Sequence, residues 1–390
     1  MCNEKVFYAA DGVSLQSSVG DIVHVKDFIA ILLKRGFRVI LAIRNNKTSR
    51  DPIIEKLALL TLPSLNFPWS FLSYVISLIL MPLALLSHKP EYIYARDNGV
   101  NISVIVGKLL RIPVFLEING DLRKEYDHLN KIISFLVINL MKLSYRSADK
   151  VIIPSQRQAS FIINMGVEGK KIVNIPNGVN PILFHPMDKS LCRAKLALPK
   201  SIYFCFVGHL APWQGIENAI IALSKIIRDN DYVNVKLILV GDGPLRKQLE
   251  KLSAKLKLEK NVLFFGSVSH ENVPTIINAS DICIAPFTAW RNKEIGVSPL
   301  KLFEYLSCGK PVVGTLIPGT EIIQRLDAGI LVEPDNVEEL KNAFKKAIGM
   351  LPYWEKKAQS LHENIAKNHS WDCRIDDILQ IMYAVSKKNS

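Results

Sequence analysis

The chain has 390 residues, of which 49% are hydrophobic, and its formal net charge at pH 7 is +13, from 49 basic and 36 acidic residues. A chain of this length is too long to fold around one ordinary hydrophobic core, so we expect about two to three domains. The basic excess leans toward residues 1–185, which carry 22 basic and 14 acidic side chains, and it favours anionic partners. Because no zinc-ligand spacing or aromatic strand signature is present, we expect phosphate or an anionic membrane surface rather than nucleic acid.

The cysteines indicate a reducing compartment. There are six of them, without paired spacing, and several lie in apolar, strand-like runs. This pattern is typical of buried thiols. Residues 1–5 lead directly into a short apolar strand, without the long hydrophobic region of a signal peptide, so we expect a cytoplasmic protein.

An apolar segment at 69–87, WSFLSYVISLILMPLALLS, is uncharged over 19 residues and is just long enough to span a membrane. Pro82 interrupts it, and the strand-like run EYIYAR follows almost at once. We therefore favour a buried or interfacial helix over a membrane span. Peripheral contact with the inner face of the cell membrane stays open as an alternative.

Strands and helices alternate along the first half of the chain. The pattern predicts a strand at 5–10, a polar loop at 11–20, a helix at 21–35 and a strand at 38–43, then strands at 91–95, 113–118 and 150–153 with a long helix at 131–147. Such alternation predicts a parallel sheet with helices on both faces.

The alternation restarts after a boundary. Asn177-Gly178 and the prolines that follow mark the end of the first domain. The second half then predicts strands at 202–207, 234–240, 261–265, 281–285, 311–314 and 329–333, and helices at 215–228, 244–257, 271–279, 298–308 and 336–349. We therefore predict an α/β protein with two tandem, doubly wound, Rossmann-like domains.

Unusual loops follow the strands of the second domain. They are VGHLAPWQG at 207–215, VGDGP at 240–244, GSVSHEN at 266–272 and APFTAWRNKEIGVSP at 285–299. Ligands of such sheets bind beyond the carboxyl ends of the strands, and glycines let backbone N–H groups approach a phosphate. We therefore expect these loops to converge on one crevice.

The stretch GVSPLKLFEYLSCGKPVVG at 296–314 predicts a short helix, because Ser298 can cap it, Pro299 suits its first position and Gly309 can end it. Lys301 lies in the first turn, where the helix already carries partial positive charge. Glu304 follows one turn later on the same face. Positive charge concentrated at a helix start suits an anionic ligand.

The chain resembles the GT-B fold retaining glycosyltransferases of family four, the glycosyl transferases group 1. The resemblance rests on an ordered set of motifs: the Gly-containing first loop, IPNGVN at 175–180, VGHLAPWQG, VGDGP, Asn-Ala-Ser-Asp at 278–281, SPLKLFEYLSCGKPVV, and HSWDCRIDDILQIMY at 369–383. The resemblance implies a first, acceptor-binding domain over 1–180, a second, nucleotide-sugar-binding domain over 181–365, and a C-terminal helix over 366–390 that packs back on the first domain. It also implies a nucleotide-diphospho-sugar co-substrate, UDP- or GDP-linked, and no other cofactor.

The resemblance assigns the donor site to the second domain. Glu304 matches the glutamate expected to bind the ribose hydroxyls. Gly296 stands where the family has a sugar-contacting glutamate, and Glu294 or the backbone at 296–298 is the alternative for that contact. His209 and Gln214 stand where the family has cations for the diphosphate. The helix start at Ser298 and the ammonium of Lys301 are therefore expected to supply that charge, with His209 or Arg291 as helpers. The remaining expected donor contacts come from the same loops and helix start: Gly208, Gly215, Gly241, Gly243, Gly266, Val268, Ser298, Pro299 and Leu300.

On the acceptor side, Gly12 and Gly20 frame the first loop, and Asn119, Gly120 and Asp121 follow a predicted strand. Family members often carry a histidine at the position of Asn119, and an amide there can still bind a sugar hydroxyl. Asn119 and Asp121 are the candidate catalytic residues, and the catalytic base stays open.

No metal is expected, although residues 229–231 spell the Asp-x-Asp pattern of metal-dependent sugar transferases. They fall where the second domain predicts a turn before a strand.

The predicted function is retaining transfer of a sugar to a saccharide or lipid-linked acceptor, in glycan, glycolipid or polysaccharide biosynthesis. The alternatives are a non-catalytic nucleotide-sugar-binding or scaffold protein of the same fold, and an epimerase or phosphorylase.

Overall fold

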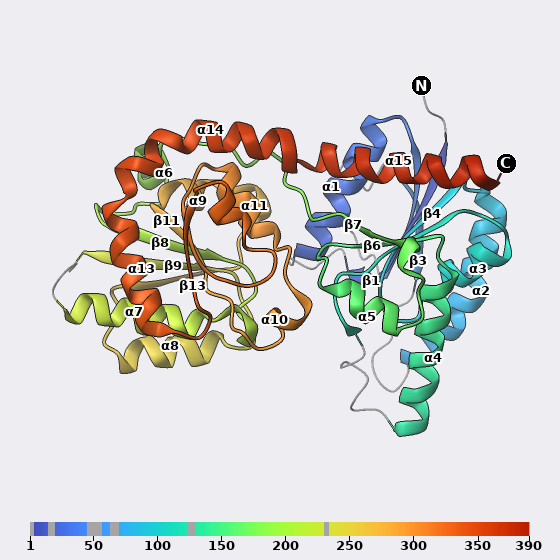
Figure 1. The fold of residues 1–390 in the computed structure, drawn as a ribbon, viewed down its shortest axis with the longest axis horizontal. Helices are drawn as coiled ribbons and strands as arrows, with labels where there is room; N and C mark the ends of the chain where they lie inside the picture. The colour runs from blue at the N-terminus through green and yellow to red at the C-terminus, as the bar shows by residue number, and fades with distance from the viewer. Residues whose placement is uncertain are drawn as a thin grey trace. The chain divides into compact units, whose positions relative to one another are not determined.

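The computed structural model describes residues 4–14, 20–44, 57–62, 70–122, 130–229 and 234–389. These residues form two compact units (Figure 1). Unit 1 contains the N-terminal strand, Asp21–Pro176 and Arg374–Ser390, and unit 2 contains chiefly Asn177–Cys373. The chain thus passes from unit 1 to unit 2 between Pro176 and Asn177 and returns at Arg374.

The sheet of unit 1 has the strand order β3-β2-β1-β4-β5-β6-β7, and neighbouring strands pair in parallel. The strands are β1 (Lys5–Ser14), β2 (Arg38–Arg44), β3 (Ala58–Leu62), β4 (Tyr92–Arg96), β5 (Val114–Glu117), β6 (Lys150–Ile153) and β7 (Ile172–Asn174). The two edge strands, β3 and β7, lie where the sequence predicts none. They are short and only partly buried, so they lack the apolar contrast of the central strands.

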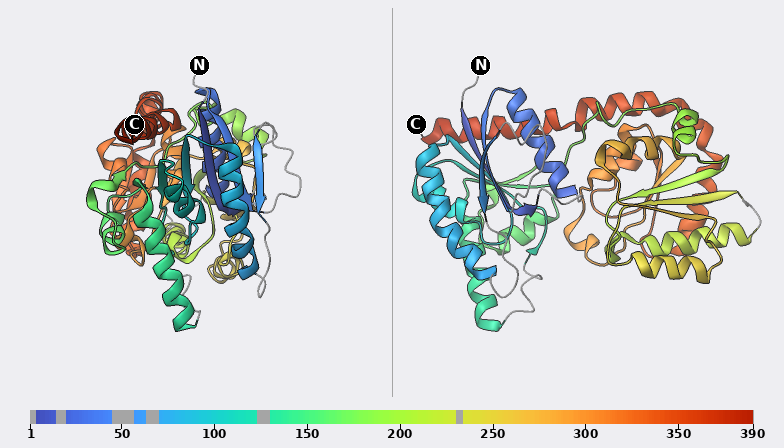
Figure 2. Two further views of the ribbon diagram at one scale, coloured as in Figure 1. Left: turned by 90° about the vertical axis from the view of Figure 1, so that its right-hand side faces the viewer. Right: turned by 180° about the vertical axis from the view of Figure 1, so that it is seen from behind.

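The helices of unit 1 lie on both faces of this sheet (Figures 1 and 2). They are α1 (Gly20–Lys34), α2 (Ser70–His88), α3 (Ile102–Leu109), α4 (Lys131–Ser147), α5 (Gln158–Asn164) and the part of α15 (Trp371–Asn389) that follows Cys373. The last helix is held to unit 1 by an ion pair between Arg35 and Asp376, at 2.9 Å, and by edge-on packing of Tyr383 against Tyr92.

The apolar segment at 69–87 forms most of α2. Met81 and Leu85 on this helix are buried in the core of unit 1. Within the part of the chain that the structure describes, no helix is long and apolar enough to cross a membrane.

The sheet of unit 2 is parallel, with the order β10-β9-β8-β11-β12-β13. Its strands are β8 (Ile202–Val207), β9 (Val235–Val240), β10 (Val262–Gly266), β11 (Ile282–Ala285), β12 (Val312–Thr315) and β13 (Gly329–Val332). Its helices are α6 (Lys189–Lys195), α7 (Ile216–Arg228), α8 (Arg246–Lys255), α9 (Val273–Ala279), α10 (Asn292–Ile295), α11 (Leu300–Ser307), α12 (Ile322–Arg325), α13 (Val337–Gly349) and α14 (Leu351–His369).

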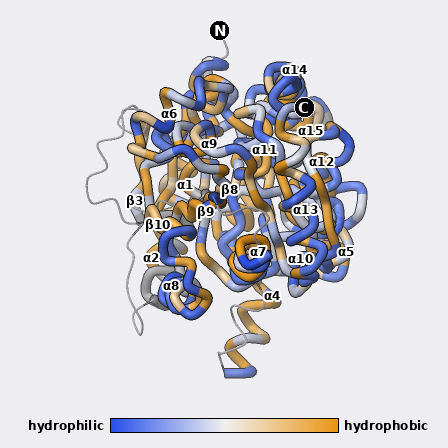
Figure 3. The backbone as a smooth tube through the Cα atoms, turned by 90° about the vertical axis from the view of Figure 1, so that its left-hand side faces the viewer, coloured by the Kyte–Doolittle hydropathy of each residue, from blue (hydrophilic) through white to orange (hydrophobic). Residues whose placement is uncertain are grey.

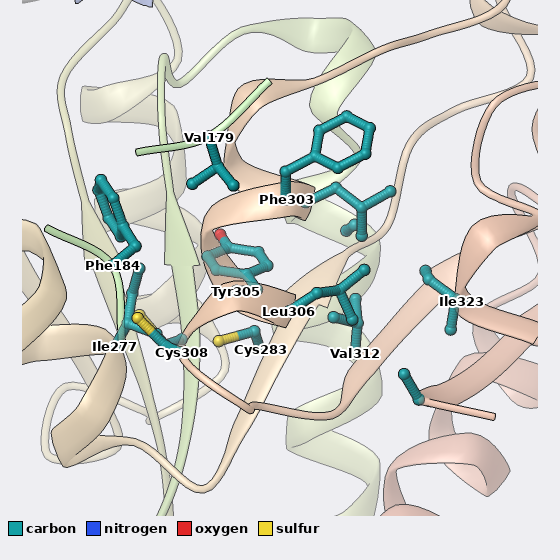
Figure 4. Close-up of a cluster of buried hydrophobic side chains, with 14 of the residues drawn as sticks. Val179, Phe184, Ile277, Cys283, Phe303, Tyr305, Leu306, Cys308, Val312 and Ile323 are labelled. Atoms are coloured by element: carbon teal, nitrogen blue, oxygen red, sulfur yellow. The ribbon is translucent and has the colours of Figure 1, made fainter. Parts of the chain in front are cut away.

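Side chains of β8 alternate between two hydrophobic cores, one on each face of this sheet. Tyr203 and Cys205 enter one core, and Phe204 and Phe206 enter the other. Figure 4 shows the first core, where Tyr305 and Leu306 of α11 lie near Cys283 and Val312 of the sheet. A strand buried on both faces reads as a continuous apolar run, which is how β8 appears in the sequence.

The prediction of two doubly wound α/β sheets is therefore confirmed. Each sheet has the strand order of a Rossmann-like fold, and the order reverses between β1 and β4 in unit 1 and between β8 and β11 in unit 2. Ligands of such sheets bind where the order reverses, beyond the carboxyl ends of the strands.

Candidate functional site

Two loops of unit 2 meet where its strand order reverses. The loop at 208–215 follows β8, and the loop at 286–299 follows β11. Asn292 donates from Nδ2 to the carbonyl oxygen of Trp213 at 2.9 Å, and the backbone N–H of Thr288 donates to the same oxygen at 3.2 Å. Of the four loops that are expected to converge, these two are joined directly by hydrogen bonds.

The start of α11 is fixed by the Asn177-Gly178 turn. Asn177 donates from its backbone N–H to Ser298 Oγ at 2.9 Å and from Nδ2 to the Ser298 carbonyl at 2.5 Å. The prediction that Ser298 caps the helix is wrong, because α11 begins at Leu300 with Pro299 as its N-cap residue and without a side-chain cap. The hydroxyl of Ser298 instead accepts from the backbone of Asn177, which gives this residue of the IPNGVN motif a structural role.

Lys301 is buried beneath the loop that follows β8. Its side chain donates from Nζ to Gln214 Oε1 at 2.8 Å, Nζ lies 3.8 Å from the centre of the Phe206 ring, and the residue is only 9% exposed. Burial disfavours the charged ammonium and lowers the pKa of Lys301 from its usual 10.5 to about 7. The lysine is therefore a cation that a bound anion would stabilise.

Glu304, 7% exposed, lies one turn further along α11. Its Oε1 is 2.9 Å from Nε2 of His270, and the imidazole ring packs against Phe184 with a centroid distance of 5.0 Å. Sequence reasoning missed His270. The residue belongs to a loop expected at the site, but nothing in the linear pattern shows that it faces a glutamate 34 positions away.

Gly208 after β8 and Gly241 after β9 have backbone N–H groups that are already paired within unit 2. The backbone N–H of Gly208 donates to Val240, and that of Gly241 donates to Gly266. These donors therefore hold the loops to one another and are not available to a phosphate. A Cβ on Gly241 would lie 2.1 Å from the carbonyl oxygen of Gly208, so Gly241 permits close packing of two loops.

This packing gives a stability prediction. Gly241→Ala meets backbone at 2.1 Å with φ at +121°, and we expect it to destabilise the protein by about 2–5 kcal/mol. Gly266→Ala is the matched control, because its φ is +69° but its nearest neighbouring atom is 3.9 Å away. We expect about 1–2 kcal/mol there. Chemical denaturation measures both values, and equal losses would contradict the packing argument.

The other expected donor contacts are distributed around these loops. Gly215 is the N-cap residue of α7, and Gly243 packs on the backbone of Leu210.

The remaining expected contacts lie nearer to α11 or in the loops beside it. Gly296 is buried with φ at 67°, and Val268 packs against a core of unit 2. Leu300 is the partly buried first residue of α11. His209 lies with its ring centre 6.5 Å from that of Trp213.

Unit 1 has a second polar cluster, at the carboxyl ends of β4 and β5. The carboxylate of Glu117 is buried and is contacted by His24, Arg96, Tyr94 and Asn119. The sequence predicts a packed or surface role for His24. In the structure His24 is buried, and its Nε2 lies 3.2 Å from Glu117 Oε1. Of the two candidate catalytic residues, Asn119 belongs to this buried polar cluster, because it contacts Glu117.

Other acceptor-side residues are placed as follows. Gly120 and Asp121 follow Asn119 in the same loop, where both are partly buried. Gly12 lies within β1 and Gly20 begins α1, so the strand runs beyond its predicted end at residue 10. The rest of the predicted first loop, 15–19, is outside the described residues.

No group of three or more His, Cys, Asp or Glu side chains able to hold a metal occurs in the described ranges of the chain. Asp229 is the residue that ends α7, and its carboxylate pairs with Lys341 at 2.9 Å. Asn230 and Asp231 lie outside the described residues.

Family models match both halves of the chain. Residues 188–368 match the family described as Glycosyl transferases group 1, and residues 22–182 match Glycosyltransferase Family 4. An uncharacterized glycosyltransferase of Methanocaldococcus jannaschii is 28% identical over 66% of this chain and 64% of its own length. A phosphatidylinositol N-acetylglucosaminyltransferase subunit of Arabidopsis thaliana is 24% identical over 63% of this chain and 49% of its own length.

The chain thus spans about half to two thirds of the length of these relatives. Among solved structures, the Anabaena protein HepE in complex with UDP-glucose superposes with a TM-score of 0.74 at 20% identity, over 98% of this chain and 99% of that one. At this identity the likeness shows the fold.

Proposed function

Because the chain belongs to the GT-B glycosyltransferases of group 1, we propose that it is a retaining, metal-independent enzyme that moves a sugar from UDP or GDP to a saccharide or lipid-linked acceptor. The proposed binding site for the nucleotide sugar rests on the start of α11. There Lys301 and Glu304 lie one turn apart, beside the loops that meet where the sheet order of unit 2 reverses. The UDP-glucose bound to the Anabaena neighbour supports a uridine nucleotide.

Each side chain has a distinct part in this proposal. The ammonium of Lys301 neutralises the diphosphate, and charge stabilisation of the leaving group lowers the barrier. The carboxylate of Glu304 accepts hydrogen bonds from the two ribose hydroxyls. Gln214, which holds Lys301 Nζ through Oε1, keeps the ammonium under the loop until an anion binds.

The transfer of the sugar needs no nucleophile from the protein. The bond between sugar C1 and the diphosphate oxygen breaks, and the bond between C1 and the acceptor oxygen forms on the same face. The proton of the acceptor hydroxyl passes to the departing phosphate oxygen. The chain contributes positioning and charge.

A membrane-proximal acceptor is supported by α4. Its large apolar side chains are exposed in the structure: Ile132, Ile133, Phe135, Leu136, Leu140 and Leu143. Hydrophobic residues are visible along this helix in Figure 3, and the same helix carries Lys131, Lys142 and Arg146. Apolar side chains beside basic ones are typical of helices that lie on anionic lipid surfaces. The Arabidopsis relative, named for a phosphatidylinositol substrate, is consistent with a lipid-linked acceptor.

This surface gives a membrane-binding prediction. The double variant Phe135→Ser/Leu136→Ser is expected to lose at least about fivefold of its binding to vesicles of phosphatidylglycerol, since each removed side chain contributes apolar burial. Ile163→Ser is the matched control, because Ile163 is similarly exposed, at 50%, on α5. Flotation at low salt measures binding. Wild-type protein that stays at the bottom of the gradient would remove the membrane from the proposal.

A non-catalytic nucleotide-sugar-binding protein is the second candidate, and the observation that favours it is Gly296 in place of the family's sugar-contacting glutamate. A panel of UDP- and GDP-sugars separates the two. A binding protein would raise its melting temperature with a donor and never form a glycoside. An enzyme would release nucleoside diphosphate in the presence of acceptor.

The enzyme is also expected to keep its rate in excess EDTA. Loss of that rate in EDTA with rescue by magnesium would refute metal independence.

A further inference from the structure

The carboxylate of Glu117 is the centre of a buried cluster in unit 1. Glu117 ends β5, is 4% exposed, and lies at the carboxyl edge of the sheet, next to the last residue of β4. Oε1 accepts from Arg96 Nη1 at 2.9 Å and lies 3.2 Å from His24 Nε2, while Oε2 accepts from Tyr94 Oη at 2.7 Å. Helix α1, strand β4 and strand β5 therefore all converge on one carboxyl group.

This carboxyl group stays ionised inside the protein. Burial alone would raise the pKa of Glu117, but the charges of His24 and Arg96 and the hydrogen bonds from Asn119 and Tyr94 outweigh it and leave the pKa below its usual value. Burial and the Glu117 charge raise the pKa of Tyr94 well above its usual value, so the phenol remains a donor. Glu117 is therefore an acceptor only.

An acceptor-only partner fixes the orientation of the Asn119 amide. Asn119 Nδ2 lies 2.7 Å from Glu117 Oε1. The reverse rotamer would place two oxygens together, one of them charged, and is excluded on electrostatic grounds. Asn119 Oδ1 must therefore point away from the cluster, as a hydrogen-bond acceptor for something else.

Gln158 adds a second acceptor next to Asn119. Its Nε2 reaches the backbone carbonyl of Asn119 at 3.5 Å, and this contact orients the amide of Gln158 in the same way, because a carbonyl can only accept. Gln158 is 3% exposed, and its buried Oε1 has no hydrogen-bond partner within the described part of the chain. A buried acceptor without a partner points to a donor that a ligand supplies.

We propose that Glu117 is a positioning residue that turns Asn119 so that its Oδ1, together with Oε1 of Gln158, accepts hydrogen bonds from hydroxyl groups of a substrate sugar. The inference rests on the proposed function, because a sugar is the substrate class that brings adjacent hydroxyl donors. The sugar belongs either to the donor or to the acceptor, and the Michaelis constants of the variants distinguish the two.

A double-mutant cycle tests the positioning role. Asn119→Ala and Glu117→Gln are each expected to lower kcat/KM by about tenfold to a hundredfold, and the double variant to be no worse than Asn119→Ala within about twofold. A rise of KM for only the nucleotide sugar assigns the hydroxyls to the donor, and a rise for only the acceptor assigns them to the acceptor. Effects of the two substitutions that multiply would overturn the proposal.

Gln158→Leu tests the second acceptor, and we expect it to raise KM for the same substrate as Asn119→Ala. An unchanged KM would remove Gln158 from the subsite. Asp149→Asn is the matched control for all these variants. It also converts a carboxylate to an amide in unit 1, where Asp149 accepts from the Val114 backbone, and it is expected to keep wild-type turnover.

Proton exchange of the Asn119 side-chain amide tests its position without any turnover, and therefore independently of the proposed function. In the ¹⁵N-labelled protein, the side-chain amide of Asn119, identified by its loss in Asn119→Ala, is expected to exchange its protons slowly with water. Glu117→Gln should make that exchange fast. If no donor is ever transferred but exchange behaves in this way, the proposed function fails and the positioning of Asn119 stands. Fast exchange in the wild type would refute the positioning itself.

Discussion

Lys301→Met is expected to weaken the binding of a nucleoside diphosphate by about 10- to 150-fold at pH 7, because a hydrogen bond to a charged group contributes about 1.5–3 kcal/mol. Methionine keeps an unbranched apolar chain against Phe206 and removes only the ammonium. Lys293→Met is the matched control, because it makes the same charge change at a side chain that is 53% exposed on α10. Titration calorimetry measures both.

The binding of the nucleoside diphosphate should also depend on pH. With a pKa of about 7 in the free protein, Lys301 loses its proton above neutrality, so wild-type affinity should fall by up to about tenfold per pH unit from pH 7 to 9. The thioether that replaces the ammonium in Lys301→Met cannot titrate, so the affinity of the variant should be flat over that range. Equal slopes for the two proteins would contradict a role for the ammonium.

The same group also affects stability, with a definite sign. The pKa of Lys301 is lower in the folded protein than in the unfolded chain, so between pH 7 and about 10.5 the unfolded chain binds more protons. The free energy of unfolding of the wild type, relative to Lys301→Met, should therefore increase as pH rises through this window. At lower pH the cost of burying the charged ammonium is fully present.

Glu304→Ala is expected to lower kcat/KM for the nucleotide sugar by about a hundredfold or more, because it removes a charged acceptor for two ribose hydroxyls. It also leaves His270 without the carboxylate that it contacts at 2.9 Å. Glu363→Ala, at an exposed glutamate on α14, is the matched control and should keep its rate.

Pyrophosphate distinguishes the roles of the two residues on α11. It has no ribose, so Glu304→Ala should bind it as the wild type does while losing affinity for UDP or GDP. Lys301→Met should lose affinity for all three ligands. If Glu304→Ala weakens pyrophosphate as much as the nucleotides, the carboxylate acts on the fold of the loops and not on the ribose.

The sequence predicts the fold well because alternation of apolar strands and amphipathic helices is a local signal. It fails at β3 and β7, since edge strands are partly exposed and their apolar pattern is weak. The ends of β1 and α1 also differ from prediction, because a strand continues wherever its neighbour pairs with it, as Ser14 does with Arg44.

The candidate site is predicted less completely, and the missing part has a physical reason. Motif spacing places Lys301 and Glu304 on one helix face, because i and i+3 positions are neighbours. The pairing of Glu304 with His270, and of Glu117 with His24, joins residues that are 34 and 93 positions apart, so only the folded chain shows them. Ser298 suits a helix cap by residue type, but tertiary contact with Asn177 takes its hydroxyl.

Helix α11 is proposed to bind the donor for a glycosyl transfer with retention. The most direct measurement follows the anomeric proton of the product by NMR, using the donor that gives the largest thermal shift, for the wild type and for Lys301→Met/Glu304→Ala. We predict a glycoside with the anomeric configuration of the donor, formed by the wild type and at least about a thousandfold more slowly by the double variant. An inverted product, or equal rates in both proteins, would contradict the account.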